Sequence, residues 1–310
     1  MNTRLRHRMV ALLRELAPKE GYTLTPLPDV RLLRADRPLS RTPVLYEPGL
    51  VIVVQGRKRG FLGDEVFVYD EQHYLVVSVP VPFTMETDAS ADKPLLAIYF
   101  RLDHAMAAEL CIQIDERHGA SSAAPRGLYS SPMEDALAAS VLRLLEALTN
   151  PPEGEVLGTA LVREIYYRVL SGAQGGSLRA ALTQQGKFGM VARAIRVIHS
   201  RYNEALSVNE LANEAAMSTP TFHAHFRAMT GTSPMRYVQS TRLHQARLLM
   251  LRQHTTAAAA ATAVGYESAS QFSREFRRLF GRPPVEEVAR MKRNFAMPAA
   301  LTPSAFVSSH

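Results

Sequence analysis

One pattern of polar and aromatic residues occurs twice in the chain, at an offset of 50 residues. The first copy runs from Ser218 to Pro234 and the second from Ser268 to Pro284, and a serine, two phenylalanines, an arginine, a glycine and a proline recur in register. Serine and the backbone amides beside it can hold phosphate at a helix N-terminus. Arginine can bind phosphate, or guanine O6 and N7 together. The repeated chemistry is therefore that of phosphate and base recognition.

Each copy of the pattern predicts a short amphipathic helix. A serine before a helical run is an N-cap, because its hydroxyl accepts from a backbone N–H that has no partner inside the helix. Phenylalanines four residues apart lie on one face and point into a core. A closing glycine permits the left-handed conformation that ends many helices. We expect two helices of about twelve residues, roughly 18 Å long, each with one buried face and one free face.

A second short helix is predicted ahead of each copy. In residues 207–215, Ser207 and Glu210 have the spacing of a capping box, and residues 256–264 are rich in alanine, the strongest helix former. Tight turns follow at residues 216–217 and 265–266. A helix, a short turn and a second helix presented outward form a helix-turn-helix unit.

A linking helix is predicted between the two units. Ser233 caps it, Pro234 suits its first position, and an apolar stripe follows at Leu243, Ala246, Leu249 and Met250. If both recognition helices face one way, they can enter successive major grooves, roughly 34 Å apart.

Residues from about 187 to 293 resemble the C-terminal DNA-binding domain of AraC/XylS-type transcriptional regulators. The residues that carry this resemblance are the paired helix-turn-helix units, Gly265-Tyr266 ahead of the second recognition helix, and the run from Phe272 to Pro284. Ala216 departs from the family pattern, which often has glycine in the first turn. The resemblance implies binding to double-stranded DNA and contact with RNA polymerase, and it favours activation over repression.

Helix phase divides the polar residues of the two recognition helices by role. The residues opposite the phenylalanines match the family's base-contacting positions, and Arg274 and His223 are the strongest candidates for reading base edges. The base-facing set is Thr219, Pro220, His223, Ala224, Ala269, Ser270, Gln271, Ser273 and Arg274. The phosphate-facing set, at the helix ends, is Ser218, Arg227, Ser268, Arg277, Arg278 and Arg282. A solvated helix face is the alternative for each.

Charge is unevenly distributed along the 310 residues, which exceed one compact core of typical size and predict two domains. From Lys187 onward there are 16 Lys and Arg against 7 Asp and Glu, whereas residues 1–186 hold 20 against 22. The basic half is the half with the repeat, as expected if it binds phosphates. The single cysteine, Cys111, cannot form an internal disulfide, which fits a reducing cytoplasm; we expect it to be buried rather than redox-active.

Residues 43–102 contain short β-prone runs separated by glycine and proline, which indicates a sandwich or barrel. The region from about 25 to 175 resembles the cupin-like N-terminal barrel of AraC-type regulators, which implies a sensing or dimerising domain without naming its ligand. The predicted fold is α+β with two domains. Residues 1–175 form a cupin-like barrel with following helices, residues 187–294 form an all-α DNA-binding domain, and residues 295–310 form a disordered tail.

A metal-dependent cupin enzyme is the alternative reading of this barrel, and it lacks the expected ligands. Such enzymes need clustered histidines and a carboxylate, but His73 stands by itself in the strand region, and His104 and His118 lie beyond it. The sequence His223-Ala-His225 lies on a predicted helix, where residues i and i+2 diverge by about 200°. We therefore predict no catalytic residue, no metal site and no cofactor.

Three features of the N-terminal half each allow two interpretations. Gln55, Arg57, Lys58 and Arg59 form either a solvated hairpin tip or a site for an anionic effector. Tyr46, Phe67, Tyr69, Tyr74 and Tyr99 belong to the core or line a pocket. The helices predicted within residues 132–170 mediate a homodimer or pack on their own sheet, and a turn or flexible link is predicted at residues 171–177.

The function that these patterns favour is a cytoplasmic regulator of transcription, controlled by a small-molecule effector in the barrel. An architectural DNA binder is a further alternative, although it would not need the barrel. Apolar runs stay below the roughly 18 residues that span a bilayer, so no membrane partner is predicted.

Overall fold

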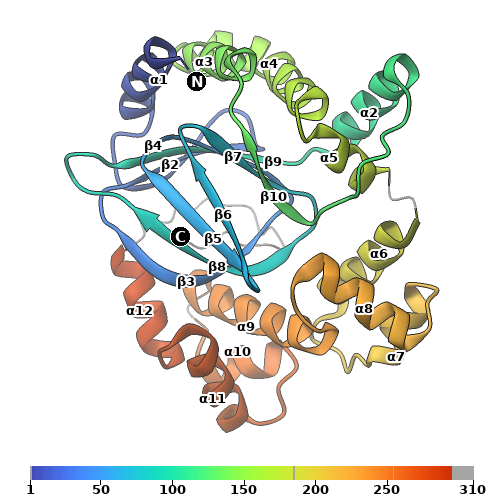
Figure 1. Cartoon of the computed structure of the whole chain (residues 1–310). Helices are drawn as coiled ribbons and strands as arrows, with labels where there is room; N and C mark the ends of the chain where they lie inside the picture. Colours follow the sequence, from blue (N-terminus) through green and yellow to red (C-terminus); the bar gives the residue numbers. More distant parts are fainter. Residues whose placement is uncertain (1, 184–185, 254, 295–310) are drawn as a thin grey trace.

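The computed structural model describes residues 2–183, 186–253 and 255–294, and the tail predicted at residues 295–310 lies outside them. The N-terminal half is an antiparallel sheet that curls into a half-barrel, with helices covering its outer face (Figure 1). In the sheet the strands follow the order β1-β2-β9-β4-β7-β6-β5-β8-β3, and β10 pairs with β7. Their bounds are β1 Gly21–Leu24, β2 Val30–Ala35, β3 Leu39–Tyr46, β4 Gly49–Gln55, β5 Arg57–Leu62, β6 Glu65–Asp70, β7 His73–Val77, β8 Val81–Asp88, β9 Leu95–Arg101 and β10 Leu128–Pro132.

Alternating residues of the sheet supply two separate cores. In β4, Leu50, Ile52 and Val54 pack under the covering helices, whereas Val51 and Val53 point into the half-barrel. This division follows from the two-residue period of a strand. Helix α1 (Thr3–Leu16) buries Met9, Leu12 and Leu13 in the first core. The other covering helices are α2 (His104–His118), α3 (Asp135–Leu148) and α4 (Pro151–Ser171).

Four strands were not predicted from the sequence: β1, β2, β8 and β10. The prolines at 80 and 82 indicated a break, but β8 begins at Val81 and runs through Pro82. Strand β5 reaches only as far as Thr84 along β8, so Pro82 lies where β8 has a neighbour, β3, on one side. Proline is tolerated in a strand that has a neighbour on one side only, because the position without an N–H can face away from that neighbour.

The predicted basic hairpin tip is wrong. Lys58 lies inside β5 with its side chain 1% exposed, and its Nζ lies 3.7 Å from Sδ of Met85 within the half-barrel. Burial lowers the pKa of this lysine well below its ordinary value. The turn is made by Gly56, and the flanking Arg57 and Arg59 point outward. Each forms ion pairs with carboxylates of neighbouring strands: Arg57 with Asp70, and Arg59 with Glu86 and Asp88.

The helices after the barrel differ in detail from the sequence prediction. Pro151 begins α4, and the small residues Gly154 and Gly158 approach Leu148 and Leu27. Leu157, an apolar residue of the same helix, is 45% exposed. Of the turn or flexible link predicted at residues 171–177, the turn is present at residues 172–174, between α4 and helix α5 (Gly175–Leu182). The segment is not a flexible link, because α5 begins within it and buries Leu178 and Ala181. Gln174, just before α5, donates from Nε2 to the carbonyl of Ser130.

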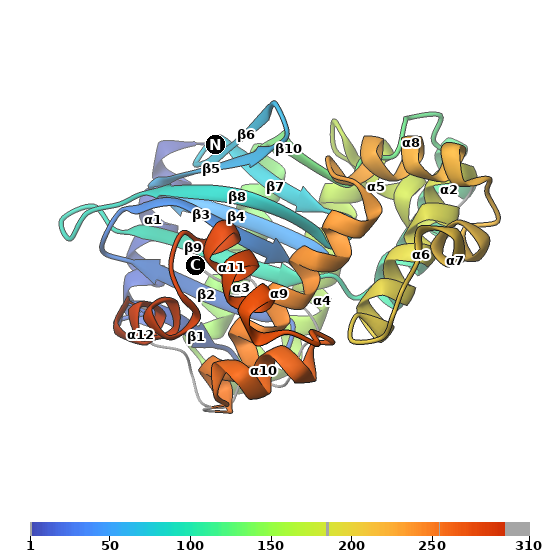
Figure 2. The ribbon, with the colours of Figure 1, turned by 90° about the horizontal axis from the view of Figure 1, so that it is seen from below.

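The C-terminal half is helical and lies against one side of the half-barrel (Figure 1). Its helices are α6 Gly186–Arg201, α7 Val208–Glu214, α8 Thr219–Thr230, α9 Pro234–Arg252, α10 Ala257–Ala263, α11 Ala269–Phe280 and α12 Pro284–Asn294. Helix α9 crosses between the two helix-turn-helix units, as Figure 2 shows from below. The predicted two-domain fold class, including the linking helix, is confirmed.

The two halves share a hydrophobic core. Val79 and Val81 of the sheet region pack in one cluster with Phe226 and Tyr237 of the helical half. Deeper along α9, Arg247 is 1% exposed and bonds both Glu287 of α12 and the carbonyl of Pro43 in β3. Helix α9 is therefore buried well beyond the four-residue stripe predicted for it.

Candidate nucleic-acid interface

Both helix-turn-helix units are built by local capping signals. Ser207 and Glu210 form the predicted capping box at the start of α7. The first turn holds Ala216 at φ +50°, and Gly265 takes φ +85° in the second. A Cβ on Gly265 would lie 2.4 Å from the carbonyl oxygen of Asn203, so glycine is required in the second turn, whereas the first tolerates alanine.

The two recognition helices, α8 and α11, are anchored in the same way. Phe222 and Phe226 of α8, and Phe272 and Phe276 of α11, are 0% exposed. The helices end at Gly231 and Gly281, with φ +69° and +76°, as the repeat predicted. The two helices belong to separate cores, one on each side of α9.

The N-caps of the two recognition helices are not equivalent. The hydroxyl of Ser268 accepts from the backbone N–H of Gln271, as expected. The hydroxyl of Ser218 donates to Oγ1 of Thr221, and its predicted cap hydrogen bond is absent. Pro220 at the second helical position lacks an N–H, which reduces the number of donors that this terminus must satisfy.

The residues expected to face bases lie on the outer surface of the two helices. Thr219 is half-buried, and its hydroxyl donates to Oδ1 of Asn209 in α7. The others are exposed, namely Pro220, His223, Ala224, Ala269, Ser270, Gln271, Ser273 and Arg274. Of the phosphate-facing set, Ser268 is half-buried, and Ser218, Arg227, Arg277, Arg278 and Arg282 are exposed.

A polar cluster that was not predicted from the sequence lies beside the second recognition helix. Glu275 accepts from the Tyr266 hydroxyl at 2.6 Å and from Nε2 of Gln271 at 3.1 Å. Burial acts to raise the pKa of Glu275, but hydrogen bonds from Tyr266, Gln239 and Gln271 and the charge of Arg278 hold that pKa below its ordinary value. The spacing of Gln271 and Glu275, i and i+4 on a helix, was the signal that could have revealed the pair.

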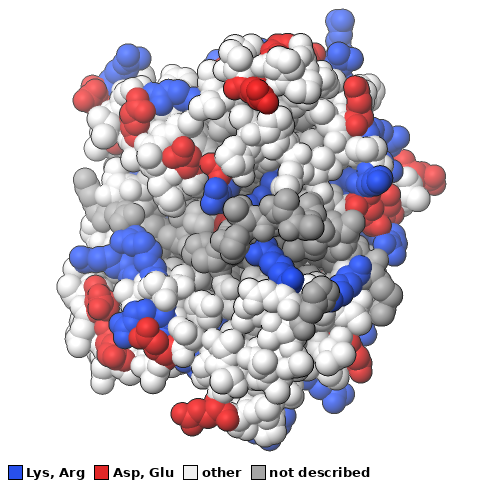
Figure 3. Space-filling view, turned by 180° about the vertical axis from the view of Figure 1, so that it is seen from behind, with Lys and Arg blue, Asp and Glu red and all other residues white. Residues whose placement is uncertain are grey.

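Charge on the face shown in Figure 3 is mixed, with Lys and Arg side chains interspersed among Asp and Glu. The candidate interface is defined by the exposed residues of α8 and α11, and not by the charge on this one face.

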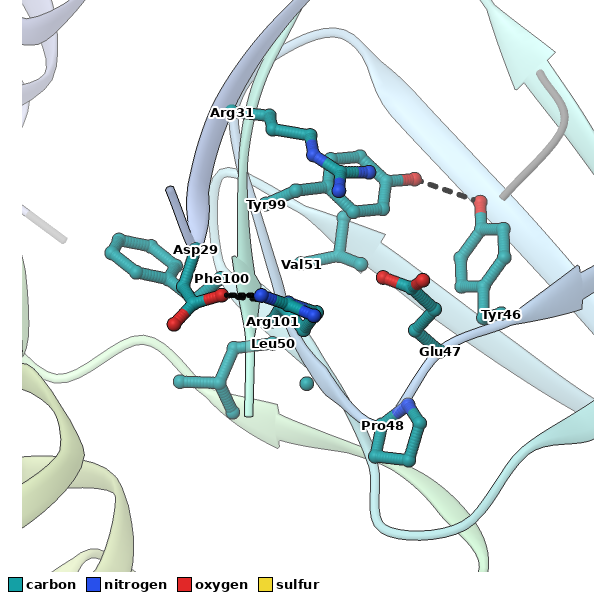
Figure 4. A pocket seen from close by; sticks show the side chains of 11 residues that line it. Asp29, Arg31, Tyr46, Glu47, Pro48, Leu50, Val51, Tyr99, Phe100 and Arg101 are labelled. Carbon is teal, nitrogen blue, oxygen red and sulfur yellow. Dashed lines mark hydrogen bonds and ion pairs between the residues drawn. The ribbon is translucent and has the colours of Figure 1, made fainter. Parts of the chain in front are cut away.

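Three tyrosine hydroxyls lie close together at one end of the half-barrel. There the Tyr99 hydroxyl donates to that of Tyr46 at 2.9 Å (Figure 4). The Tyr46 and Tyr69 hydroxyl oxygens lie 3.4 Å apart. Asp29 pairs with Arg101 at the rim. The hollow between these groups has a volume of about 20 Å³, room for roughly one water molecule. A larger cleft of about 420 Å³ lies between the half-barrel and the helical half.

The residues weighed for metal binding lie apart. His73 begins β7 beside Asp70, and His104 begins α2. Within the described ranges, no group of three or more His, Cys, Asp or Glu side chains is placed to hold an ion. Cys111 is buried, and burial raises the pKa of its thiol to about 11. No helix among the described residues is both long and apolar enough to cross a bilayer.

Comparison with known proteins gives both halves of the chain a counterpart. Residues 26–177 match the family described as the AraC-type transcriptional regulator N-terminus, and residues 211–290 match a helix-turn-helix domain. A putative AraC-like transcription regulator of Streptomyces lividans is 35% identical over 95 residues, 31% of each chain. The transcriptional activator RhaS of Escherichia fergusonii is 31% identical over 149 residues, 47% of this chain and 52% of its own. The chain thus spans about half or less of the length of these relatives.

The solved structure of apo ToxT from Vibrio cholerae has the same two-domain fold. It is 10% identical, with a TM-score of 0.58, and the match covers 87% of this chain and 99% of that one. A half-barrel joined to paired helix-turn-helix units defines a class of two-domain regulators. The chain belongs to the AraC/XylS family of transcriptional regulators. This membership confirms the resemblance seen in the sequence, and it favours a regulator over the metal-dependent enzyme.

Proposed function

We propose that the protein is a sequence-specific DNA-binding regulator of transcription that reads two adjacent major-groove sub-sites. The observation that carries this proposal is the duplicated construction of α8 and α11. Each helix has two fully buried phenylalanines on one face and exposed polar residues on the other. A helix held by one face and free on the opposite face is what major-groove recognition requires.

The exposed residues have distinct proposed roles. Arg274 reads guanine, because its guanidinium matches O6 and N7. His223 donates to or accepts from a base edge, and Pro220 and Ala224 offer apolar contact, for instance to a thymine methyl. The arginines at the helix ends, Arg227, Arg277, Arg278 and Arg282, bind phosphates and fix the register.

Control of this activity is proposed to come from an effector bound by the half-barrel. The hollow at Tyr46 and Tyr99 is too small for one as it stands, so binding requires side chains at the barrel mouth to move. Activation is the proposed direction of regulation, since three of the relatives, each named RhaS, are transcriptional activators. Contact with RNA polymerase, a homodimer and a cytoplasmic location complete the proposal by family resemblance.

Selection from a randomised DNA library at about 150 mM salt tests this function. We expect a single motif with two sub-sites about one helical turn apart. Recovery of unselected DNA, with an affinity that collapses as salt rises, would indicate phosphate binding only and would contradict the proposal.

A further inference from the structure

The side chain of Gln271 is oriented by its neighbour. Gln271 lies exposed in the first turn of α11, and its Nε2 donates to Oε1 of Glu275, 3.1 Å away. A carboxylate has no proton to donate, so only the NH₂ side of the amide can face it. Turning the amide over would place its Oε1 against the carboxylate. The carbonyl oxygen of Gln271 is therefore held away from Glu275.

Glu275 is itself tied to the core of the second unit. Its Oε2 accepts from the Tyr266 hydroxyl at 2.6 Å. Tyr266 is 8% exposed, and its ring packs edge-on against the fully buried Phe272, with centroids 5.4 Å apart. The carboxylate therefore has little freedom to release Gln271.

The first unit has no such arrangement. Fifty residues earlier, the positions of Gln271 and Glu275 are occupied by Thr221 and His225. The residue that follows the left-handed turn residue is Tyr266 in the second unit and Met217 in the first. An effect that depends on the carboxylate should therefore appear in one sub-site and not in the other.

We propose that Glu275 is a positioning residue that makes Gln271 present its carbonyl oxygen to DNA, so that α11 selects adenine or cytosine at the base beside Gln271. This inference rests on the proposed function. In the major groove, adenine and cytosine present an amino group that can donate to an oxygen, whereas guanine O6 and thymine O4 are acceptors. A carbonyl oxygen held toward the groove accepts from the amino group of adenine or cytosine, and it is repelled by guanine O6 or thymine O4.

The test compares DNA selections by the full chain and by Glu275→Ala. We expect the wild type to prefer adenine or cytosine about tenfold or more at one base of the second sub-site. In Glu275→Ala the amide can turn over and donate to guanine or thymine, so that preference should fall to about twofold or less. Preferences in the first sub-site should be unchanged, which also shows that the variant is folded.

Further variants separate positioning from other effects. Glu267→Ala removes a second carboxylate of the same unit, one that is exposed, and should raise affinity for all DNA without changing base preference. Gln271→Ala should abolish the preference, and adding Glu275→Ala to it should change nothing further at that base, because the two residues act as one unit. Tyr266→Phe leaves the Glu275 carboxylate in place but removes the hydrogen bond that holds it. The base preference of this variant should lie between those of the wild type and Glu275→Ala.

Two results would overturn the inference while leaving the proposed function intact. One is a wild-type motif with guanine or thymine at that base, and the other is a preference that Glu275→Ala leaves unchanged. A wild type that selects no motif would instead overturn the proposed function, and this inference with it.

Discussion

Arg274 and Arg277 are three residues apart on α11, and both are exposed. Arg274 lies opposite the buried phenylalanines, whereas Arg277 belongs to the last turn. We predict that Arg274→Ala loses about 1–3 kcal/mol of discrimination at one base of the second sub-site. Arg277→Ala should weaken binding to all sequences alike and reduce the slope of log affinity against log salt by about 0.9. Titrations of the selected motif and of single-base variants, at several salt concentrations, measure both quantities.

The contrast between these two variants is its own control, because each removes one positive charge from the same helix. If Arg274→Ala lowered the affinity for all sequences equally, Arg274 would be a phosphate ligand. The proposed division between base-facing and phosphate-facing residues would then be wrong for α11.

Single residues were also where interpretation of the sequence failed most clearly. Four polar residues from Gln55 to Arg59 resembled a solvated tip, yet Lys58 is buried between two outward arginines. The two-residue alternation of a strand places Lys58 on the inward face of the sheet. Because lysine is rarely buried, the basic residues of this segment indicated a solvated turn instead. Ser218 is the opposite case, because its N-cap position was predicted correctly and its hydrogen bond was not. The Ser218 hydroxyl donates to Oγ1 of Thr221, a side-chain contact that the N-cap pattern does not predict.

At the scale of elements, the two C-terminal glycines of the recognition helices form a matched pair. Gly231 and Gly281 have nearly the same left-handed φ, but a Cβ on Gly281 would meet nothing within 4 Å. A Cβ on Gly231 would lie 2.7 Å from Cδ1 of Leu62 in β5. We predict that Gly281→Ala costs about 1–2 kcal/mol from backbone strain. Gly231→Ala should cost more, because the half-barrel must also yield.

Urea unfolding of the two glycine variants measures this difference in the free energy of unfolding. Leu62→Ala provides the control, since it removes the side chain that the new methyl group would meet. In that background the two glycine substitutions should cost the same. Equal costs in the wild-type background would mean that the contact between Gly231 and Leu62 does not form in solution.

The recognition helices were predictable because their signals are local. A serine cap, two phenylalanines and a glycine placed them at residues 218–230 and 268–280, within one residue of the observed bounds. Strands β1, β2, β8 and β10 were missed because nothing local identifies them. Strand β8 carries Pro82, and its place in the sheet depends on pairing with β3, about 40 residues away. Pairing partners that distant are a property of the fold, not of the strand's own composition.

For the whole molecule, the half-barrel and the helical C-terminal half are joined by shared packing as well as by the chain. Val79 and Val81 share a core with Phe226 and Tyr237, which lie more than 140 residues later. The sequence could not predict this contact, since each side reads as the core of its own domain. Because of this contact, a change in the half-barrel can reach α8 and α9 directly through packed side chains.

A buried hydrogen-bonded chain through this contact predicts a pH dependence of stability. The Tyr237 hydroxyl donates to the Pro80 carbonyl at 2.7 Å, and Nε2 of His199 lies 2.7 Å from the same hydroxyl. Tyr237 gives its one proton to Pro80, so His199 is the donor to Tyr237. Burial lowers the pKa of His199 from 6.5 to about 3. His199 therefore stays neutral in the folded protein where the unfolded chain would already be charged.

Below about pH 6.5, His199 binds a proton in the unfolded chain but not in the folded protein. The free energy of unfolding should therefore fall as pH drops toward 3. The slope should approach about 1.4 kcal/mol per pH unit for each such histidine. His244 adds a contribution of the same sign, because burial and the charge of Arg247 lower its pKa well below the ordinary value. His199→Gln keeps an N–H donor for Tyr237 but cannot titrate, so it should reduce the slope and leave His244's share. Urea unfolding of both proteins between pH 7 and 5 measures the difference, and equal slopes would show that His199 is not a titrating group in this contact.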